Sequence, residues 1–169
     1  MRLNLREIIE MPGTEMYFDC VIGTDRLNLP SIKGFRTPPS AEGKIRNSAG
    51  LLTLTGELHT DMICVCDRCG AEFYLTRDFG VDATLSAGSQ DSENPDVFPL
   101  DGDMLDVGNI LETAFILNAD VKCICREDCA GLCGSCGANL NSEPCECKVK
   151  IDPRLAVLAQ FSDTVEEPE

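Results

Sequence analysis

The residues most capable of chemistry in this chain are its cysteines. Residues 123–147 read CICREDCAGLCGSCGANLNSEPCEC and contain seven of the eleven cysteines in the 169-residue chain. Clustered thiols serve disulfide bonds, a redox dithiol, an iron–sulfur cluster or a structural metal. The spacing of the cysteines, and the elements around them, decide among these four uses.

Short-range doublets favour a structural metal. The chain contains Cys66-Asp67-Arg68-Cys69, Cys133-Gly134-Ser135-Cys136 and Cys145-Glu146-Cys147, and Gly follows both Cys69 and Cys136. A Gly at that position lets the backbone turn under a metal ion without a side-chain clash. Two such turns supply four thiolates in the tetrahedral arrangement of a closed Zn²⁺ site. We therefore expect one or two structural Zn²⁺ ions.

Eight cysteines are predicted to form two four-cysteine sites. One site would consist of Cys133, Cys136, Cys145 and Cys147, and the other of Cys66, Cys69, Cys125 and Cys129. The latter would attach a C-terminal module to the rest of the protein. Cys64 and Cys123 each lie two residues before a predicted ligand, so either can substitute for that ligand. A single site with spare thiols is the remaining arrangement.

The other uses of cysteine fit the sequence less well. Eleven is an odd number, and the chain shows neither a signal segment nor an apolar run of membrane-spanning length, so we expect a reducing, cytoplasmic location without disulfides. Neither C-x2-C motif lies at the strand-to-helix step of a thioredoxin-type pair. Cys129, Cys133 and Cys136 have a spacing that resembles radical S-adenosylmethionine enzymes, but only 33 residues follow Cys136. That length is too short for the large barrel of those enzymes.

No catalytic constellation is evident in the sequence. His59 is the single histidine, and it lies in an alternating segment where a surface strand position is the simpler interpretation. The glycine motifs of nucleotide-binding loops and of the nucleophile elbow are absent. We expect a protein that is not an enzyme, and an RNA-processing hydrolase or an iron–sulfur redox protein is the less favoured alternative.

The cysteine sites need elements to position them, and hydrophobic periodicity predicts these elements. Residues 5–11 are expected to form a short helix, 16–23 and 25–29 a strand pair, and the Pro- and Gly-rich residues 31–50 a loop. Alternation over 51–66 and 72–87 predicts a long hairpin with a cysteine turn at its tip.

Two further helices are predicted. Apolar residues at helical spacing predict a helix over 107–118, capped by Asp106 or Asn109. The Asp152-Pro153 start predicts a closing helix over 151–161. Between the hairpin and the first of these helices, the polar residues 88–104 are expected to form an exposed connection.

Together these elements predict an α+β fold. We expect an antiparallel β-domain, for which a partly open barrel is one arrangement, with one or two packed helices and a C-terminal cysteine-rich zinc module. The β-rich domain is expected over residues 1–120, with an acidic loop at 88–105. The zinc module with its closing helix is expected over 121–162, and a flexible tail over 163–169.

The charge is acidic and unevenly distributed. The formal net charge is −15, and residues 78–120 contain ten acids and no Lys or Arg. This distribution suits a basic partner and argues against strong binding to phosphates, although solubility alone is the simpler explanation. The one local excess of positive charge makes Lys33, Arg36, Lys44 and Arg46 the candidates for RNA contact.

The motifs resemble those of a known family. The Cys66–Cys69 turn, the capped helix, EDCAGLCGSCGANLN (127–141) and IDPRLAVL (151–158) are similar to the YceD-like family, domain-of-unknown-function family 177. The resemblance runs over nearly the whole chain, and the string from Gly131 to Asn141 is its most specific part. It implies a small cytoplasmic bacterial protein needed for accumulation of large-subunit (23S) ribosomal RNA, with no established catalytic residue.

The resemblance and the acidic charge together predict a non-enzymatic ribosome-assembly factor. It would contact a precursor of the large ribosomal subunit, through rRNA or a basic ribosomal protein, and would have no membrane or small-molecule partner. The alternative is a zinc-stabilised adaptor or holdase with a non-ribosomal partner, and only the family resemblance separates the two.

Overall fold

A computed structural model describes residues 1–86, 97–147 and Arg154. The chain divides into two compact units, Met1–Cys125 and Arg126–Glu169. The predicted closing helix at 151–161, apart from Arg154, lies outside the described residues, as do the predicted tail and the acidic residues 88–96. The finer division at residues 120 and 162 stays a prediction. No helix in the described ranges has the length and apolar character needed to cross a membrane.

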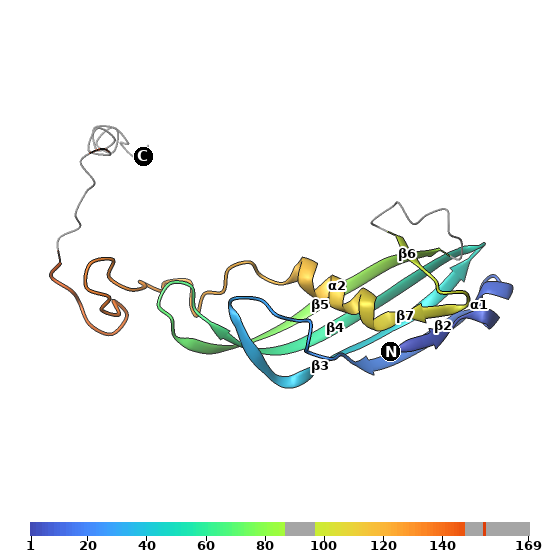
Figure 1. Cartoon of the computed structure of the whole chain (residues 1–169), viewed down its shortest axis with the longest axis horizontal. Coiled ribbons are helices and arrows are strands. Elements are labelled where there is room, and N and C mark those ends of the chain that lie inside the picture. The colour runs from blue at the N-terminus through green and yellow to red at the C-terminus, as the bar shows by residue number, and fades with distance from the viewer. Residues whose placement is uncertain (87–96, 148–153, 155–169) are drawn as a thin grey trace, which may run out of the picture. The chain divides into compact units, whose positions relative to one another are not determined.

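The first unit is built on a five-stranded sheet (Figure 1). Its strands are β2 (Glu15–Val21), β3 (Ile32–Ser48), β4 (Leu51–Val65), β5 (Glu72–Ser86) and β6 (Val97–Pro99), and they pair in that order. The first three pairings are antiparallel, whereas β5 and β6 are parallel, so the sheet is mixed rather than wholly antiparallel as predicted. The α+β class is confirmed, and a barrel is not.

The predicted hairpin is confirmed. β4 and β5 pair without a register shift from Leu52↔Leu85 to Val65↔Glu72, and the cysteine turn joins them. Along β4, Leu52, Leu54 and Leu58 are buried and alternate with exposed or half-buried side chains, which is the period of two that predicted a strand.

The prediction of a loop at 31–50 is wrong, because most of this segment is the long strand β3. Ala41 and Ile45 are buried at alternate positions, and neighbours pair on both sides of the strand. Pro38 and Pro39 lie where the β3–β4 register shifts, a place where a residue without an N–H does not interrupt the ladder. The Pro39 carbonyl accepts a hydrogen bond from Ile22 at 2.8 Å, so even this irregular part is fixed.

Residues 25–29 do not form the predicted strand. Leu27 N–H donates to the Thr24 carbonyl at 3.1 Å in a turn, and the Leu27 side chain is buried. β2 pairs instead with β3, from Glu15↔Arg46 to Val21↔Ser40. Leu27 and Leu29 therefore pack into the core although they lie in a loop.

The predicted connection at 88–104 contains more structure than expected. Besides β6, it includes the start of β7 (Met104–Asp106), which pairs with β1 (Arg2–Asn4) in a separate two-stranded sheet. Leu105 is buried at the centre of β7, an apolar anchor that the surrounding acids conceal in the sequence.

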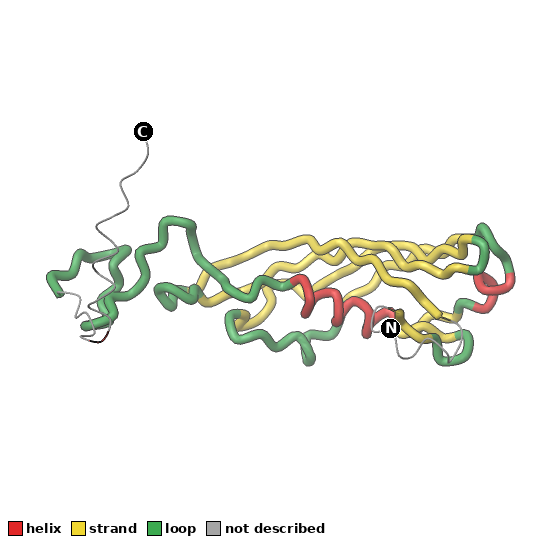
Figure 2. Tube along the Cα trace, turned by 90° about the horizontal axis from the view of Figure 1, so that it is seen from above, coloured by secondary structure: helices red, strands yellow, loops and turns green. Residues whose placement is uncertain are grey.

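Both helices predicted within the described residues are confirmed. α1 spans Arg6–Glu10, and α2 spans Val107–Asn118 with the Asp106 carboxylate accepting the Asn109 N–H at 3.4 Å. α2 lies against one face of the sheet (Figure 2). Phe115, fully buried, has its ring centroid 5.8 Å from those of Phe35 and Phe79, so the helix is fixed by aromatic packing against β3 and β5.

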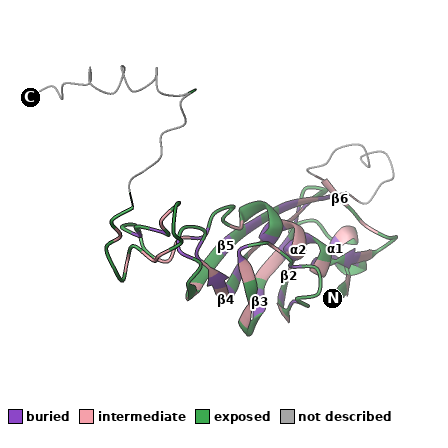
Figure 3. Ribbon diagram, turned by 60° about the vertical axis from the view of Figure 1, so that its left-hand side comes forward, coloured by how far each residue is buried: buried purple, intermediate pink, exposed green. Residues whose placement is uncertain are grey.

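The strands bring two glycines face to face in the middle of the sheet. Gly43 of β3 pairs with Gly56 of β4. Buried and half-buried positions recur along both strands (Figure 3). A Cβ on Gly43 would lie 2.8 Å from Phe18 Cζ and from Gly56 Cα, and closer still to the Thr55 carbonyl oxygen. The Phe18 ring thus occupies space that these glycines leave open.

We predict that Gly43→Ala destabilises the protein, whereas Gly80→Ala does not. The added methyl group at Gly43 overpacks the core, with an expected cost of about 1–3 kcal/mol. Gly80 on β5 is a matched control, since a Cβ there meets no atom within 4 Å. Urea unfolding followed by circular dichroism measures both variants. Equal midpoints for the two would contradict the close approach of β3 and β4.

Candidate metal centres

Two groups of four cysteines converge in the structure. The first cysteine group is Cys66, Cys69, Cys125 and Cys129, and the second cysteine group is Cys133, Cys136, Cys145 and Cys147. Within each group the Sγ atoms all lie within 4.8 Å of one another. The structure thus brings together the eight cysteines that spacing selected, in the same two sets; their binding of metal stays a prediction.

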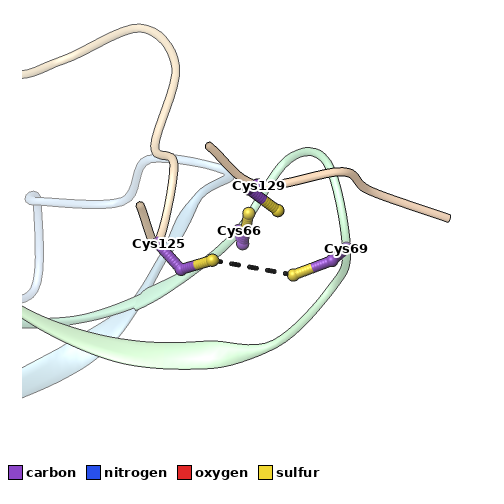
Figure 4. A group of neighbouring side chains, drawn as sticks. All are labelled: Cys66, Cys69, Cys125 and Cys129. Atoms are coloured by element: carbon purple, nitrogen blue, oxygen red, sulfur yellow. Dashed lines mark hydrogen bonds between the residues drawn. The ribbon is translucent and has the colours of Figure 1, made fainter. Parts of the chain in front are cut away.

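The first cysteine group begins at the tip of the β4–β5 hairpin. Cys66 and Cys69 come from the turn, and the Cys69 and Cys125 sulfurs are 3.8 Å apart (Figure 4). Cys125 ends the first unit, and Cys129 follows four residues later in the chain. Cys66 and Cys129 are buried, so this group is largely shielded from solvent.

The two Cys-x2-Cys turns have the same backbone design. In the first, Gly70 N–H donates to the Cys66 carbonyl at 2.8 Å, and Cys66 N–H donates to the Ala71 carbonyl at 2.9 Å. In the second, the pairs Gly137–Cys133 and Cys133–Ala138 repeat this pattern, both at 2.8 Å. Gly70 and Gly137 have φ values of 70° and 75°, the left-handed conformation that favours Gly. The glycines therefore have the role that the sequence assigned to them.

Asp67 holds the Cys125 segment beside the first turn. Its carboxylate accepts the Cys123 N–H at 2.7 Å, and its own N–H donates to the Cys123 carbonyl at 2.9 Å. The Ser31 hydroxyl, which is buried, donates to the same carboxylate at 3.0 Å. Sequence spacing did not identify Asp67 or Ser31 as part of the site, although Asp67 lies inside the Cys-x2-Cys motif.

The second cysteine group is more exposed than the first. Cys136 and Cys147 are exposed, and Cys133 and Cys145 are half-buried. The Cys136 and Cys145 sulfurs are 3.8 Å apart, and those of Cys145 and Cys133 are 3.2 Å apart. Backbone N–H groups point at two of these sulfurs, from Ser135 to Cys133 at 3.4 Å and from Cys147 to Cys145 at 3.3 Å.

The protein environment stabilises a thiolate in each group. Burial acts to raise the pKa of Cys66, but N–H groups of Cys125, Cys69 and Arg68 outweigh it and lower that pKa to about 6. N–H groups of Cys136 and Ser135 likewise lower the pKa of Cys133 to about 6. Thiolate sulfur is the form that binds metals, so backbone hydrogen bonds prepare both groups for a cation.

In the second cysteine group, neighbouring thiols also raise one another's pKa. The hydrogen bond with Cys133 raises the pKa of Cys145, and the neighbouring thiols of Cys145 and Cys136 raise that of Cys147 to about 12. The sulfurs are therefore too close to lose all their protons together, unless a positive ion lies among them.

The geometry and the donor chemistry fit zinc. Zn–S bonds of about 2.3 Å in a tetrahedron place the sulfurs about 3.8 Å apart. The Cys69–Cys125 and Cys136–Cys145 separations are both 3.8 Å. Four thiolates without a carboxylate or imidazole are typical of closed structural Zn²⁺ sites, which leave no coordination position for a substrate. The two groups could therefore hold one metal ion each.

The packing of the second unit supports the same interpretation. Among the described residues of this unit, Cys129 is the only one with a buried hydrophobic side chain. A segment with so few buried apolar groups needs another source of cohesion, which a metal ion or a disulfide supplies in small modules. No disulfide joins any of the eleven cysteines, all of which lie in the described residues.

Cys64 and Cys123, the possible substitutes, belong to the core instead. Both are buried among apolar residues of the first unit. Burial raises the pKa of Cys64 to about 12, and the adjacent Cys123 thiol contributes to that increase. Burial also raises the pKa of Cys123. These thiols have the chemistry of packing groups rather than of ligands.

The four candidates for RNA contact lie along β3 rather than on a loop, and each contacts an acid. The pairs are Lys33 with Glu72, Arg36 with Asp61 at 3.5 Å, Lys44 with Glu15 at 3.2 Å and Arg46 with Glu15 at 3.6 Å. The Arg36 guanidinium also lies 4.7 Å from the centroid of the Tyr74 ring. An acid that already neutralises a base weakens its attraction for a phosphate.

Comparison with known proteins places the site in a family. The family model described as "Large ribosomal RNA subunit accumulation protein YceD" matches residues 54–162, a range that includes both cysteine groups and α2. The chain belongs to the YceD family. The family is named for accumulation of ribosomal RNA and not for a catalytic activity.

Relatives of this YceD-family chain are found in mycobacteria. Uncharacterized proteins of Mycobacterium bovis and of two strains of Mycobacterium tuberculosis are each 31% identical to it over 128 residues. The similarity covers 70% of this chain and 60% of each relative, so the chain spans about 60% of the length of the curated relatives it matches. No solved structure matches it significantly.

We predict that this YceD-family protein binds two Zn²⁺ ions per chain. Cys66→Ser and Cys133→Ser should each remove one ion, because each takes a ligand from a different group. Cys64→Ala should retain both, since Cys64 lies in the core. Native mass spectrometry together with elemental analysis counts the ions. Loss of an ion from Cys64→Ala would instead make Cys64 a ligand.

A second prediction concerns Asp67. Asp67→Ala removes the acceptor of the Cys123 N–H and should weaken metal binding at the first cysteine group by about 10- to 100-fold, as is usual for a group that orients a ligand. Competition with a chelator measures this affinity. Asp25→Ala, in the loop between β2 and β3, is the control of equal charge change. An Asp67 variant with unchanged metal affinity would show that the hydrogen bond from Cys123 is not needed to position Cys125.

Proposed function

We propose that this protein is a non-enzymatic ribosome-assembly factor that supports accumulation and processing of large-subunit (23S) rRNA by contacting a basic ribosomal protein. The observation that carries the proposal is membership of the YceD family, whose description names accumulation of the large ribosomal RNA subunit. The site geometry is consistent with this role, because closed four-thiolate groups supply structure rather than a reactive centre.

The surface charge favours a protein partner over RNA. The net charge is −15, and the basic side chains of β3 are engaged by acids. Binding to an RNA backbone depends on free Lys and Arg to displace counterions. Many ribosomal proteins are basic, so an acidic factor attracts them and repels the RNA.

A row of acids crosses the sheet at a defined place. Asp19 of β2 pairs with Glu42 of β3, and Glu42 pairs with Glu57 of β4, so three exposed carboxylates lie side by side on three strands. Within the described part of the chain, none of the ion pairs includes these three residues. Like charges directly opposite one another destabilise a sheet, and a basic partner would relieve that repulsion.

The zinc centres would stabilise the protein in this function. The first cysteine group would fix the end of the β4–β5 hairpin, and the second would hold together residues 126–147, which bury few apolar side chains. The predicted metal ions would thus stabilise the fold, and the row of Asp19, Glu42 and Glu57 would contact the basic partner.

The proposal predicts how the protein sediments in a cell lysate. At low salt it should migrate with precursors of the large subunit and be absent from mature ribosomes. The triple variant Asp19→Asn, Glu42→Gln, Glu57→Gln should lose most of this association. A variant with Glu7, Glu143 and Glu146 changed to Gln is the control, because its net charge is the same.

Other distributions in the gradient would contradict the proposal. Recovery of the protein only at the top would favour an adaptor or holdase with a non-ribosomal partner. Unchanged association of the triple variant, with loss on changing Lys33 and Arg36 to Gln, would make RNA the direct partner.

A further inference from the structure

Asn141 has more polar contacts than its half-buried position in a short segment would require. It ends the Asn139-Leu140-Asn141 string, which lies between the ligands Cys136 and Cys145. Its side-chain oxygen accepts the Ala130 N–H at 2.9 Å and an Arg126 N–H at 2.8 Å. Its side-chain Nδ2 lies 3.4 Å from the Cys129 sulfur.

The neighbours of Asn141 determine which way its amide points. The Ala130 backbone nitrogen can only donate, so it requires the amide oxygen on its side. Nδ2 then points to the Cys129 sulfur and to the Asn139 side-chain oxygen, which is 2.8 Å away. Asn139 also accepts the Asn141 backbone N–H at 3.0 Å, so the first Asn holds the second in place.

The same asparagines close the hairpin that carries the second cysteine group. Leu140 N–H donates to the Gly131 carbonyl at 2.9 Å, and Leu132 pairs with Asn139 in a β-bridge. Cys133 and Cys136 lie in the turn between these two segments, and Cys145 follows within contact of both. The segment from Gly131 to Asn141 thus contains two members of the second cysteine group, and its Asn141 side chain donates an N–H to Cys129 of the first group.

We propose that Asn141 is a positioning residue that couples the two metal centres. Its side-chain N–H donates a hydrogen bond to the Cys129 thiolate of the first centre. Asn141 itself directly follows the hairpin that carries Cys133 and Cys136 of the second centre. The proposal rests on metal binding by both cysteine groups. It assigns a function to the Asn pair in the most specific part of the family motif, a part that ligand chemistry alone leaves unexplained.

The coupling follows from two physical effects. An N–H donated to a thiolate stabilises its negative charge and fixes the orientation of the ligand before metal binds. A metal ion in the second cysteine group orders the hairpin, which places Asn141 for that donation. By linkage, a metal in the first group must favour binding in the second to the same extent.

The test uses ¹¹³Cd²⁺ as the probe on the full chain, because each four-thiolate centre gives its own NMR signal. Cys66→Ser assigns the signals, and stepwise addition of a chelator then reports the affinity of each centre. Asn141→Ala should weaken the first centre about tenfold and shift its signal, since the sulfur loses a donor. Asn141→Asp keeps the oxygen acceptor but lacks the donor, and should also weaken the first centre. Asn118→Ala, which changes an amide in α2, is the matched control.

Coupling is separated from a local effect by a double-mutant cycle. Cys133→Ser with Cys136→Ser removes the second centre and should weaken the first by a similar factor. Adding Asn141→Ala to that variant should then have little further effect, since the route between the centres is already lost. Circular dichroism of the sheet checks that each variant is folded.

Three results would overturn the proposal. An unchanged first centre in folded Asn141→Ala would remove the positioning role. Fully additive losses in the cycle would show that the two centres are independent. Absence of any ¹¹³Cd signal would instead refute the metal centres themselves, and the sedimentation experiment would still decide the proposed function.

Discussion

The uninterrupted register between β4 and β5 is the constraint on which the rest of the first unit depends. Because successive side chains of a strand point to opposite faces, a shift of one residue would turn every core side chain of β4 outward. The same shift would move the cysteine turn relative to Cys125. One set of backbone hydrogen bonds therefore places both the apolar face that α2 covers and the Cys66–Cys69 turn.

Clustered thiols and hydrophobic packing divide the described part of the chain between them. The first unit has a continuous core in which Phe115 of α2 packs against Phe35 and Phe79. The described part of the second unit has hydrogen-bonded turns and thiols in its place. This division explains why so many cysteines are concentrated where large apolar side chains are scarce.

Sequence reasoning succeeded where one local rule governs the outcome. The period of two predicted the β4–β5 hairpin, helical spacing and an acidic cap predicted α2, and a Gly after Cys-x2-Cys predicted the metal-type turns. It failed for β3, because two prolines and several polar residues hide a strand that neighbours on both sides stabilise. It also failed to find β1 and β7, which are only three residues long and pair across a hundred residues of chain. Asp67 and Asn141 could not be identified, because the spacing of cysteines shows which thiols can converge, but not which hydrogen bonds hold their segments in place.

The separation of the ligands along the chain has a consequence for the order of events during synthesis. Cys69 and Cys125 are 56 residues apart, whereas Cys136 and Cys145 are nine residues apart. Loop closure over the longer separation costs about 1.6 kcal/mol more, by the logarithmic dependence of closure entropy on length. Cys66 and Cys69 are therefore made well before Cys125 and Cys129, with which they converge, whereas the cysteines of the second group can come together as soon as residues 133–147 have been made. The first cysteine group is therefore assembled late, when the β-domain and the residues beyond α2 are both present.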